Sequence, residues 1–541
     1  MTSNDKEASI EKGIGPYLET QAEDLTELNT ESGVNRAYEL KCHLILPATL
    51  FEPSITDTFC IRIGFGRYQI ELFVLTGFGW MADNIWLQGV AIVLPQVQQE
   101  LNPVRVEFAT LALYVGLIIG ASLWGVLADL IGRRVSFNIT LFLAGVFGIA
   151  SAGSPNFTTF GALVACLGFG VGGKMISGAL YLEHIPGSYQ WTLTLLSAWW
   201  AIGQLVASVV AWGFIGNFSC ASDVPVGQCP KAENMGWRYT LRLGALTLLM
   251  FICRFFIFNL QESPKYLIAN GRDEEAIKVM EHLARKNGKS ISLTLDQLQE
   301  IQGSATLPLR TMLQVVKESF SHLSLSHVKP LFAGRKLAIN SSITILLWGL
   351  IGLAYPLFSA FLPFYLRDRV PSGNSAVSVT YRNYTIVSVL GIPGSLIACA
   401  VVDWTRRSGK YSFGGRKLVM AVSTTLTGIF LFLFTTSNSQ AAVLGYTCTT
   451  SVTSYMYGVL YAYTPEVFPA PHRGTGDSIA SSFNRITGIL SPVIKIATTS
   501  AVGALVPTRT GQPIFVSASL FLVAALLMLF LPIETAGKAA L

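Results

Sequence analysis

The chain has 541 residues, of which 51% are hydrophobic and only 13% are charged, and its mean hydropathy is +0.49. Because an ordinary soluble protein is about 25% charged, this composition excludes a water-soluble globular fold of this length. The net charge of +6 is small, and much of it lies where the cytoplasmic loops of a membrane protein would be, so we expect no nucleic-acid partner.

The chain begins with a polar segment. Residues 1–35 are rich in Glu, Asp and Thr and contain no apolar run that would act as a cleaved leader. We therefore expect residues 1–71 to form a cytoplasmic N-terminal segment, and the first membrane helix to insert as its own internal signal.

Twelve apolar runs follow, each near the length of about 20 residues that a membrane-crossing helix needs. A polar linker over 261–337 divides them into an N-terminal bundle over 72–260 and a C-terminal bundle over 338–533, and a cytoplasmic tail over 534–541 ends the chain. We predict an all-α membrane protein with twelve transmembrane helices in two pseudo-symmetric six-helix bundles. The expected spans are 72–96, 108–129, 135–153, 159–182, 192–216, 238–260, 338–366, 381–403, 418–436, 440–463, 476–503 and 513–533.

Lysine and arginine indicate the orientation, because they favour cytoplasmic loops. The short loops on the two sides are nearly balanced, but Arg62 and Arg67 before the first span and the edges of the linker favour a cytoplasmic N-terminus. Both termini are then cytoplasmic, and we expect the plasma membrane. Asn156 and Asn217, each in an Asn-x-Ser/Thr sequon, then face outward as candidate glycosylation sites.

No motif points to an enzyme, a metal or a cofactor. The stretch GFGVGGKM at 168–175 matches most of a phosphate-binding loop, but Met175 replaces the Mg²⁺-binding Ser or Thr and no strand precedes it. The glycines fit close helix packing better. None of the eight cysteines forms a CxxC pair; Cys220 and Cys229, in one polar outer loop, are either a disulfide or two free thiols.

The two halves repeat one another weakly. Glu183 begins EHIP after the fourth span, and Glu466 begins EVFP after the tenth. Asp129, followed by two arginines, ends the second span, and Asp403 with Arg406 and Arg407 ends the eighth. Such repetition is typical of transporters that move one half against the other around a site at the middle of the membrane.

Several motifs resemble those of the major facilitator superfamily. GVLADLIGRR at 125–134 is similar to its loop signature, although Leu130 replaces the usual basic residue. QESPKYLIANGRDEEA and PEVFPAPHRGTG resemble the sugar-porter and organic-ion branch, which includes synaptic-vesicle-glycoprotein-like carriers. GFGWMADNIWLQGV at 77–90 resembles the first helix of fungal members. The resemblance implies a monomeric carrier of a small solute that works by alternating access.

Asp83 is the first candidate for the transport site. It is the twelfth residue of the first span and therefore lies near the bilayer centre. An acid at that depth often relays protons, and acids of the first helix have that role in relatives. The alternative is a structural Asp83 that is paired with a cation or caps a break in the helix.

Arg485 is the second candidate. It lies nine residues into the eleventh span, or about 13–14 Å deep in a core of about 30 Å. A guanidinium at that depth needs an anion, a cluster of carbonyls or a water-filled cavity. Arg485 is therefore either a binder of a substrate anion or the permanent partner of Asp83.

Other polar and aromatic residues complete the expected site. Lys174 stands where similar fungal chains have Asn, and it either meets the substrate or extends to the interface. Arg254, near the cytoplasmic end of the sixth span, is expected to extend to the interface. The expected walls are Asn84, Gln88, Gln204, Trp348, Tyr355, Tyr455, Tyr457 and Asn484.

The resemblance also implies a cytoplasmic gate. In relatives the Asp of the loop signature faces the N-terminal end of the eleventh helix and holds the cytoplasmic side shut. The alternative is a set of charges that only fixes the topology. The residues concerned are Gly125, Asp129, Gly132, Arg133, Arg134, Glu183, Asp403, Arg407, Glu466 and Arg473.

The expected function is proton-coupled symport of a small polar, anionic organic solute across the membrane. The excess of cationic over acidic candidates in the spans favours an anion. Three alternatives stay open: efflux of a secondary metabolite or toxin by proton antiport, sugar uptake, and a nutrient sensor that does not transport. The short C-terminal tail argues against the sensor.

Overall fold

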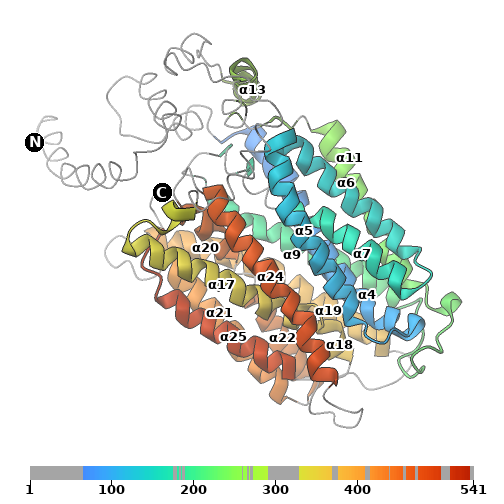
Figure 1. Cartoon of the computed structure of the whole chain (residues 1–541). Helices are drawn as coiled ribbons and strands as arrows, with labels where there is room; N and C mark the ends of the chain where they lie inside the picture. The colour runs from blue at the N-terminus through green and yellow to red at the C-terminus, as the bar shows by residue number, and fades with distance from the viewer. Residues whose placement is uncertain are drawn as a thin grey trace, which may run out of the picture.

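The computed structural model describes residues 65–174, 191–258, 272–289, 328–367, 376–407, 415–437, 439–454, 458–468, 473–500 and 512–535, with short stretches between 180 and 189 and between 260 and 267. These residues form helices that run side by side in one elongated bundle, shown in Figure 1. No strand occurs in these ranges.

The first half of the bundle contains six of the expected spans. Short turns join the first four helices, and the sixth span is divided into three helical pieces, the last of which is a π-helical turn. The elements are α4 (Arg67–Leu101), α5 (Glu107–Ile131), α6 (Arg133–Ala152), α7 (Phe157–Val171), η1 (Gly172–Lys174), α9 (Trp191–Ile215), η3 (Lys231–Glu233), α10 (Gly236–Leu241), α11 (Gly244–Ile252) and η4 (Cys253–Ile257).

The second half contains the other six expected spans, and helix α13 (Asp273–Lys286) lies between the halves in sequence. Several spans of this half are also interrupted, as at Ala360 and Phe361 in the seventh. The elements are η5 (Lys329–Phe332), α17 (Arg335–Ser359), α18 (Leu362–Arg367), α19 (Ala376–Val389), α20 (Gly391–Arg407), α21 (Gly415–Thr436), α22 (Gln440–Ser454), α23 (Gly458–Val467), α24 (Arg473–Ser500) and α25 (Gln512–Leu529).

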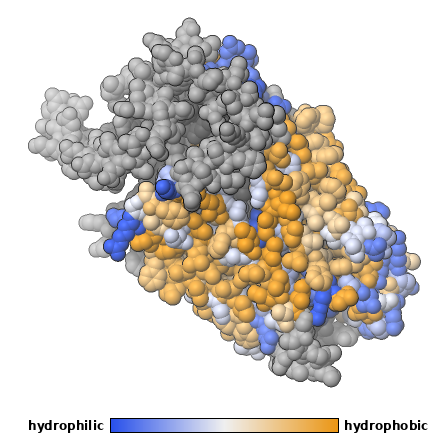
Figure 2. All heavy atoms as spheres, viewed as in Figure 1, coloured by the Kyte–Doolittle hydropathy of each residue, from blue (hydrophilic) through white to orange (hydrophobic). Residues whose placement is uncertain are grey.

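Composition explains which helices face lipid. In the described part of the chain, 8 helices or helix pairs are long and apolar enough to cross a membrane. Large apolar side chains such as Leu526 and Phe256 are exposed on the sides of the bundle, and Figure 2 shows a hydrophobic flank with hydrophilic residues toward its ends. Helices α4 and α24 are long but less apolar, because they carry buried polar residues that include Asp83 and Arg485.

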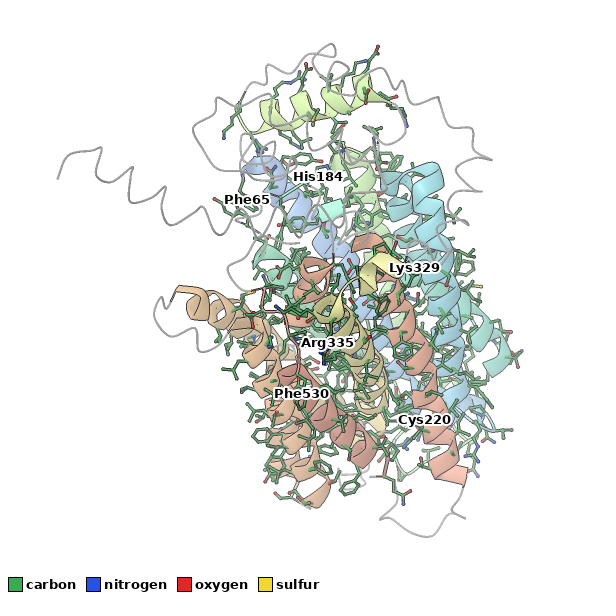
Figure 3. The ribbon with its side chains drawn as sticks, turned by 60° about the vertical axis from the view of Figure 1, so that its left-hand side comes forward. Phe65, His184, Cys220, Lys329, Arg335 and Phe530 are labelled. Atoms are coloured by element: carbon green, nitrogen blue, oxygen red, sulfur yellow. A yellow bond between two sulfur atoms is a disulfide. The ribbon has the colours of Figure 1, made fainter. Side chains whose placement is uncertain are left out.

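The two ends of the bundle carry different structures. At one end, α13 lies against the start of α4, where Lys286 forms an ion pair with Glu71. The backbone N–H of Tyr68 also donates to Oδ1 of Asn287 at 3.0 Å. Figures 1 and 3 show α13 at this end, and Cys220 labels a loop toward the other.

His282 lies at the junction of α13 and α4. Its ring meets the ring of Tyr68 edge-on, with centroids 6.5 Å apart. Burial, together with the positive charges of Lys286 and Arg285, lowers the pKa of His282, since all three disfavour the protonated ring. These effects favour the neutral form of the His282 ring.

The two halves begin their third helices in the same way. Gly132, with φ +96°, precedes α6, and a carboxylate oxygen of Glu262 accepts from the backbone N–H of Arg134 at 3.1 Å. Gly415, with φ +69°, begins α21, and Glu534 accepts from the N–H groups of the next two residues at 3.0 and 3.2 Å. Both turns need glycine because side chains disfavour positive φ.

This symmetry corrects one expectation from the sequence. The repeat suggests that Arg406 and Arg407 correspond to the basic pair Arg133 and Arg134. In the structure, the residues that follow the positive-φ glycine and begin the ninth span are Arg416 and Lys417, whereas Arg406 and Arg407 are the last residues of α20. In the second half, a longer connection after α20 separates the acidic residue of the loop motif from its basic pair. A constant offset between the halves therefore assigns the wrong basic pair.

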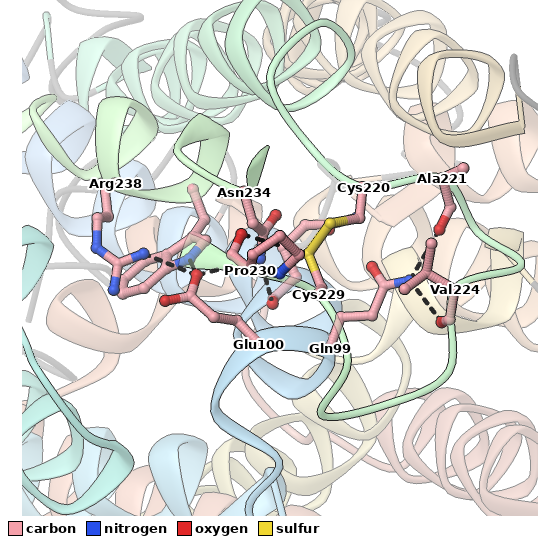
Figure 4. The surroundings of a disulfide bond; sticks show 11 residues. Gln99, Glu100, Cys220, Ala221, Val224, Cys229, Pro230, Asn234 and Arg238 are labelled. Atoms are coloured by element: carbon pink, nitrogen blue, oxygen red, sulfur yellow. Dashed lines mark hydrogen bonds and ion pairs between the residues drawn. A yellow bond between two sulfur atoms is a disulfide. The ribbon is translucent and has the colours of Figure 1, made fainter. Parts of the chain in front are cut away.

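A disulfide joins Cys220 and Cys229, and Figure 4 shows its surroundings. Its loop is tied to the end of α4: Nε2 of Gln99 donates to the carbonyl oxygens of Ala221 and Val224 at 3.0 and 3.3 Å. The sequon residues belong to the same end of the bundle. Asn156 is the N-cap of α7 and accepts from the N–H of Thr159 at 2.9 Å, and Asn217 follows the end of α9.

Next to this loop is a buried ion pair. Nη1 of Arg238 lies 2.7 Å from a carboxylate oxygen of Glu100, and the two side chains are 5% and 6% exposed. The indole N–H of Trp237 donates to the same oxygen at 2.8 Å, and the Arg238 guanidinium lies 4.1 Å from the Trp237 ring. The pair fixes the end of α4 to α10.

We expect Arg238→Met to lower the free energy of unfolding by about 3–5 kcal/mol, because it leaves the Glu100 carboxylate buried without its cation. Thermal unfolding of the purified protein in detergent measures this loss. Arg242→Met is the matched control, since Arg242 is exposed one turn later and its loss should change the midpoint little. An equal shift in both variants would contradict this role of the pair.

Candidate functional site

A cavity lies between the two halves, near the middle of the bundle. Its volume is about 80 Å³, room for about five to eight water molecules. Helices α4, α5 and α9 of the first half and α17, α23 and α24 of the second line it. The polar and aromatic side chains in the wall are Asp83, Gln88, Thr110, Tyr114, Trp200, Trp348, Tyr355, Ser359, Tyr461, Ser481, Asn484 and Arg485.

Asp83 is held against α9. The indole N–H of Trp200 donates to Oδ2 of Asp83 at 2.9 Å, and Nδ2 of the neighbouring Asn84 donates to the Trp200 carbonyl at 2.7 Å. The backbones of α4 and α9 approach closely, because Gly203 packs directly on the Met81 carbonyl. Asp83 is 5% exposed, so one rigid helix pair holds a buried acid at the cavity wall.

Arg485 crosses from the second half to the first. Its Nη1 donates to two carbonyl oxygens, those of Leu117 in α5 and Gly172 in η1, both at 2.9 Å. The side chain is 8% exposed and lines the same cavity as Asp83. Both of its hydrogen bonds within the described residues therefore go to backbone carbonyls of the first half and not to a carboxylate.

Aromatic rings from both halves form much of the wall. The Trp200 and Tyr355 ring centroids are 5.4 Å apart, and those of Trp348 and Tyr461 are 4.5 Å apart in an edge-on arrangement. The indole N–H of Trp348 donates to the Thr464 hydroxyl at 2.8 Å. All four rings belong to residues that line the cavity.

The halves touch on both sides of the cavity. Toward the disulfide end, the Tyr384 hydroxyl donates to Oε1 of Gln88 at 2.5 Å, and the Tyr381 hydroxyl donates to the Ile92 carbonyl at 2.9 Å. Toward the α13 end, Trp80 of α4 packs edge-on against Tyr461 of α23, with centroids 4.9 Å apart. The cavity therefore lies between two sets of contacts that join the halves.

The structure brings six of the predicted site residues together. They are Asp83, Gln88, Trp348, Tyr355, Asn484 and Arg485, all of which line the cavity. Asn84 and Gln204 are buried but do not line it. Tyr455 and Tyr457 lie outside the described residues, as does the side chain of Lys174, the last residue of η1.

Some residues of the site do not stand out in the sequence. Tyr114, Trp200 and Tyr461 line the cavity, but eight of the twelve expected spans contain tyrosine or tryptophan, and the sequence alone does not select these three. The adjacent pair Trp199 and Trp200 in the fifth span is the feature of the sequence that points to Trp200.

Arg254 corrects another expectation. It does not extend to the interface but is fully buried in the π-helical turn, at 0% exposure. Its guanidinium lies 3.3 Å from the centre of the Phe137 ring and donates to the carbonyls of Phe137 and Leu75. The wider π-helical turn changes the direction of residue 254, which a regular helical wheel does not anticipate.

Only part of the expected gate is described. Glu466 forms an ion pair with Arg416, with 2.6 Å between their atoms and side chains that are 4% and 8% exposed. Gly132 and the backbone of Arg134 form the turn before α6. Glu183 lies outside the described residues. The structure also does not describe the exposure of Gly125 or the side chains of Asp129, Arg133, Asp403, Arg407 and Arg473.

Gly488 gives a testable constraint on the cavity wall. A Cβ atom there would lie 2.6 Å from Cε1 of Tyr114, so Gly488→Ala must push this ring away from α24. We expect at least tenfold slower transport at an unchanged protein level, because the α5–α24 contact joins the halves. Gly445→Ala in α22, where a Cβ would meet no atom within 4 Å, should transport normally; equal activity of the two variants would contradict the constraint.

Comparisons with known proteins agree with this architecture. The family model described as "Sugar (and other) transporter" matches residues 94–540. A relative named MFS siderochrome iron transporter 1, from Ceriporiopsis subvermispora (strain B), is 42% identical over 551 residues, which cover 100% of this chain and 99% of the relative. Major facilitator-type transporter hxnZ of Emericella nidulans is 41% identical, over 94% of this chain and 90% of its own.

A solved structure shows the same fold. The xylose transporter XylE from E. coli, in a partially occluded inward open conformation, aligns with a TM-score of 0.63 at 19% sequence identity. The alignment covers 87% of this chain and 99% of that one. At this identity the likeness concerns the fold alone.

Proposed function

Because this chain belongs to the Sugar (and other) transporter family of the major facilitator superfamily, it is a secondary transporter and not an enzyme, and we propose that it moves a small anionic organic solute together with protons. The main support is Arg485, a buried cation in the wall of the central cavity. Only its Nη1 is bonded within the described residues. Its other N–H groups would then bind a carboxylate of the solute.

Asp83 is the proposed proton carrier. It lines the same cavity and accepts the Trp200 N–H. An acid at this depth exchanges protons wherever the cavity opens to water. Solute anion and proton would then bind in one cavity and cross together, which makes the transported pair electrically neutral.

Alternating access requires that the two sets of contacts between the halves open in turn. Tyr384–Gln88 and Tyr381–Ile92 would separate to open the disulfide end. Trp80–Tyr461 and the Arg485 bonds would separate to open the α13 end. The halves also meet along α5 and α24 and along α9 and α19, so each opening step separates helix faces as well as these side-chain contacts.

The proposed setting is the plasma membrane, with a monomer whose α13 end and termini are cytoplasmic. Lys286, Arg416 and Lys417 lie at that end, and the disulfide and both sequons lie at the other. A fluorescent fusion would locate the protein. A glycosidase-sensitive band that Asn156→Gln or Asn217→Gln removes would support the orientation, and glycosylation of an engineered sequon in 1–35 would contradict it.

The function is tested by uptake into proteoliposomes. Radiolabelled carboxylates, sugars and amines are compared at two pH values, with and without an inward proton gradient. We expect carboxylates to enter fastest, to accumulate with acid outside, and to lose accumulation when a protonophore is added. Preferred uptake of sugars, or accumulation without a proton gradient, would contradict the proposal; accumulation driven by an opposed gradient would indicate antiport and efflux.

A further inference from the structure

A second cavity lies within the first half of the bundle, beside Asp83. Helices α4, α6 and α7 line it together with the turns η1 and η4, and its volume is about 20 Å³, room for about one or two water molecules. Asp83 lines this inner chamber and also lines the central cavity. The acid that we propose as the proton carrier therefore borders two spaces, of which only the central cavity is proposed to hold the solute.

Arg254 lines the inner chamber from η4. Its guanidinium donates to the carbonyl oxygens of Phe137 in α6 and Leu75 in α4 and lies 3.3 Å from the centre of the Phe137 ring. Leu75 comes eight residues before Asp83 in α4, which places it about 12 Å nearer to the α13 end of the bundle. Arg254 therefore lies between the acid and the end that is proposed to be cytoplasmic.

No carboxylate among the described residues bonds to Arg254. The side chain is 0% exposed, both of its hydrogen bonds go to backbone carbonyls, and its Nε has no acceptor within the described residues. A neutral amide side chain could make such bonds at a lower desolvation cost. An ionised group at this depth is a candidate for a functional role, and the charge itself is what distinguishes Arg254 from such an amide.

The other charged and polar groups near the two spaces differ from Arg254 in position. Arg485 lines the central cavity with Asp83 and belongs to α24 of the second half. Lys174 ends η1, and its side chain lies outside the described residues. The Thr140 hydroxyl in the inner chamber donates to a backbone carbonyl at 2.8 Å. Among the described side chains, Arg254 is therefore the one cation in the wall of the inner chamber.

A proton on Asp83 has two ways toward the α13 end. Through the opened central cavity it leaves together with the solute, whereas through the inner chamber it would leave alone and dissipate the gradient. Buried apolar side chains, such as Leu72 before Leu75 in α4, lie nearer to the α13 end. They exclude ions, but a transient chain of water molecules between them would still conduct protons. A fixed positive charge beside such a chain raises the energy of an excess proton, as in water channels.

We propose that Arg254 is an electrostatic barrier that closes the inner chamber to protons, so that the proton of Asp83 leaves only through the central cavity with the solute. This inference rests on the proposed function, because it takes Asp83 as the proton carrier. Arg254 acts on the proton and does not touch the solute. Its loss should therefore create a proton leak that needs no solute.

The test measures proton entry into proteoliposomes that contain the full-length protein and no solute. A pH-sensitive dye is trapped inside, the outside is made acidic, and valinomycin with potassium on both sides holds the membrane potential at zero. A unit charge about 12 Å away at an effective dielectric constant of about 20 disfavours an excess proton about tenfold. We therefore expect Arg254→Gln to leak protons at least about tenfold faster than the unmodified protein, and Arg254→Lys, which keeps the charge, to stay tight.

Three further variants identify the path of the leak. Asp83→Asn added to Arg254→Gln should abolish it, because the proton then has no carrier. Ala144→Val added to Arg254→Gln should reduce it, because Ala144 lines the inner chamber and the larger side chain fills it. Lys174→Met alone should stay tight. Counterflow of labelled solute through Arg254→Gln should stay near the unmodified rate, which shows that the variant is folded.

The inference has a second variant in case Arg254→Gln does not insert. Thr140→Asp keeps Arg254 and its carbonyl bonds but places a carboxylate in the same chamber, and it should leak as well. Tight liposomes with a variant that is active in counterflow, an equal leak in Arg254→Lys, or a leak that survives Asp83→Asn would overturn the inference.

Failure of the inference can be told from failure of the proposed function. If the unmodified protein accumulates solute in a proton gradient, Asp83→Asn does not, and Arg254→Gln stays tight, only the barrier is wrong. If Asp83→Asn still accumulates solute, the proposed proton role of Asp83 is wrong and the inference fails with it.

Discussion

Carboxylate uptake into proteoliposomes should fall by about 10–100-fold when Arg485 is replaced by lysine, although the positive charge is kept. One hydrogen bond to a charged group contributes about 1.5–3 kcal/mol, and a factor of ten corresponds to about 1.4 kcal/mol. The shorter ammonium cannot hold both carbonyls, of Leu117 and Gly172, and also present a planar fork to the solute.

The form of the loss separates two roles for Arg485. If the guanidinium binds the solute, KM should rise more than kcat falls, and binding measured by calorimetry should weaken equally. If it only joins the halves, binding should persist while the turnover rate changes. Arg242→Lys, on the exposed surface, controls for insertion and protein level. Normal transport by Arg485→Lys would show that Arg485 does not clamp the solute.

Asp83→Asn should abolish proton-driven accumulation while exchange of solute across the membrane continues. Asparagine cannot take up a proton at this position, but its Oδ1 can still accept the Trp200 N–H that Asp83 accepts at 2.9 Å, so the wall should keep its shape. The accumulation ratio in a tenfold proton gradient should fall from about ten, because one proton per solute transfers the same free energy of about 1.4 kcal/mol to the solute gradient, to about one.

Counterflow provides the internal control for this variant. Liposomes preloaded with unlabelled solute should take up labelled solute through Asp83→Asn at a rate near that of the unmodified protein, because exchange needs no net proton movement. If accumulation survives in Asp83→Asn, the proton is carried elsewhere and this role is wrong. If counterflow is also lost, Asp83 is required for solute binding or for the conformational change. Proton coupling is then not a distinct role of Asp83.

The sequence was sufficient for the helices and for the depth of two charges. Apolar runs of the right length mark each span, because a bilayer imposes a length on any segment that crosses it. Asp83 and Arg485 stand out because ionised groups are costly inside apolar runs. Both line one cavity, as their depths suggested, although they belong to helices that are far apart in the chain.

The sequence was insufficient where helix rotation or a local irregularity decides the outcome. Trp200 lines the cavity, while Gln204, one turn further along the same face of α9, does not, so position along the helix axis decides which of the two reaches the cavity. Arg254 is buried because it lies on a π-helical turn. The basic pair of the second half is Arg416 and Lys417, and not the expected Arg406 and Arg407, because the connection after α20 is longer than the one after α5.

The hydrogen-bond partners of Arg485 are backbone carbonyls, and this affects which substitutions the sequence can accept during evolution. A partner that is a main-chain oxygen survives nearly any substitution at its own position, as at Leu117. Gly172, by contrast, is held to glycine by the close approach of α5 rather than by the bond itself. Among the described residues, Arg485 therefore has no hydrogen-bonded side chain whose substitution could compensate for its own replacement. Substitutions of Arg485 itself would then not be tolerated. The residues around it, including the aromatic residues of the cavity wall, could change and alter which solute is preferred.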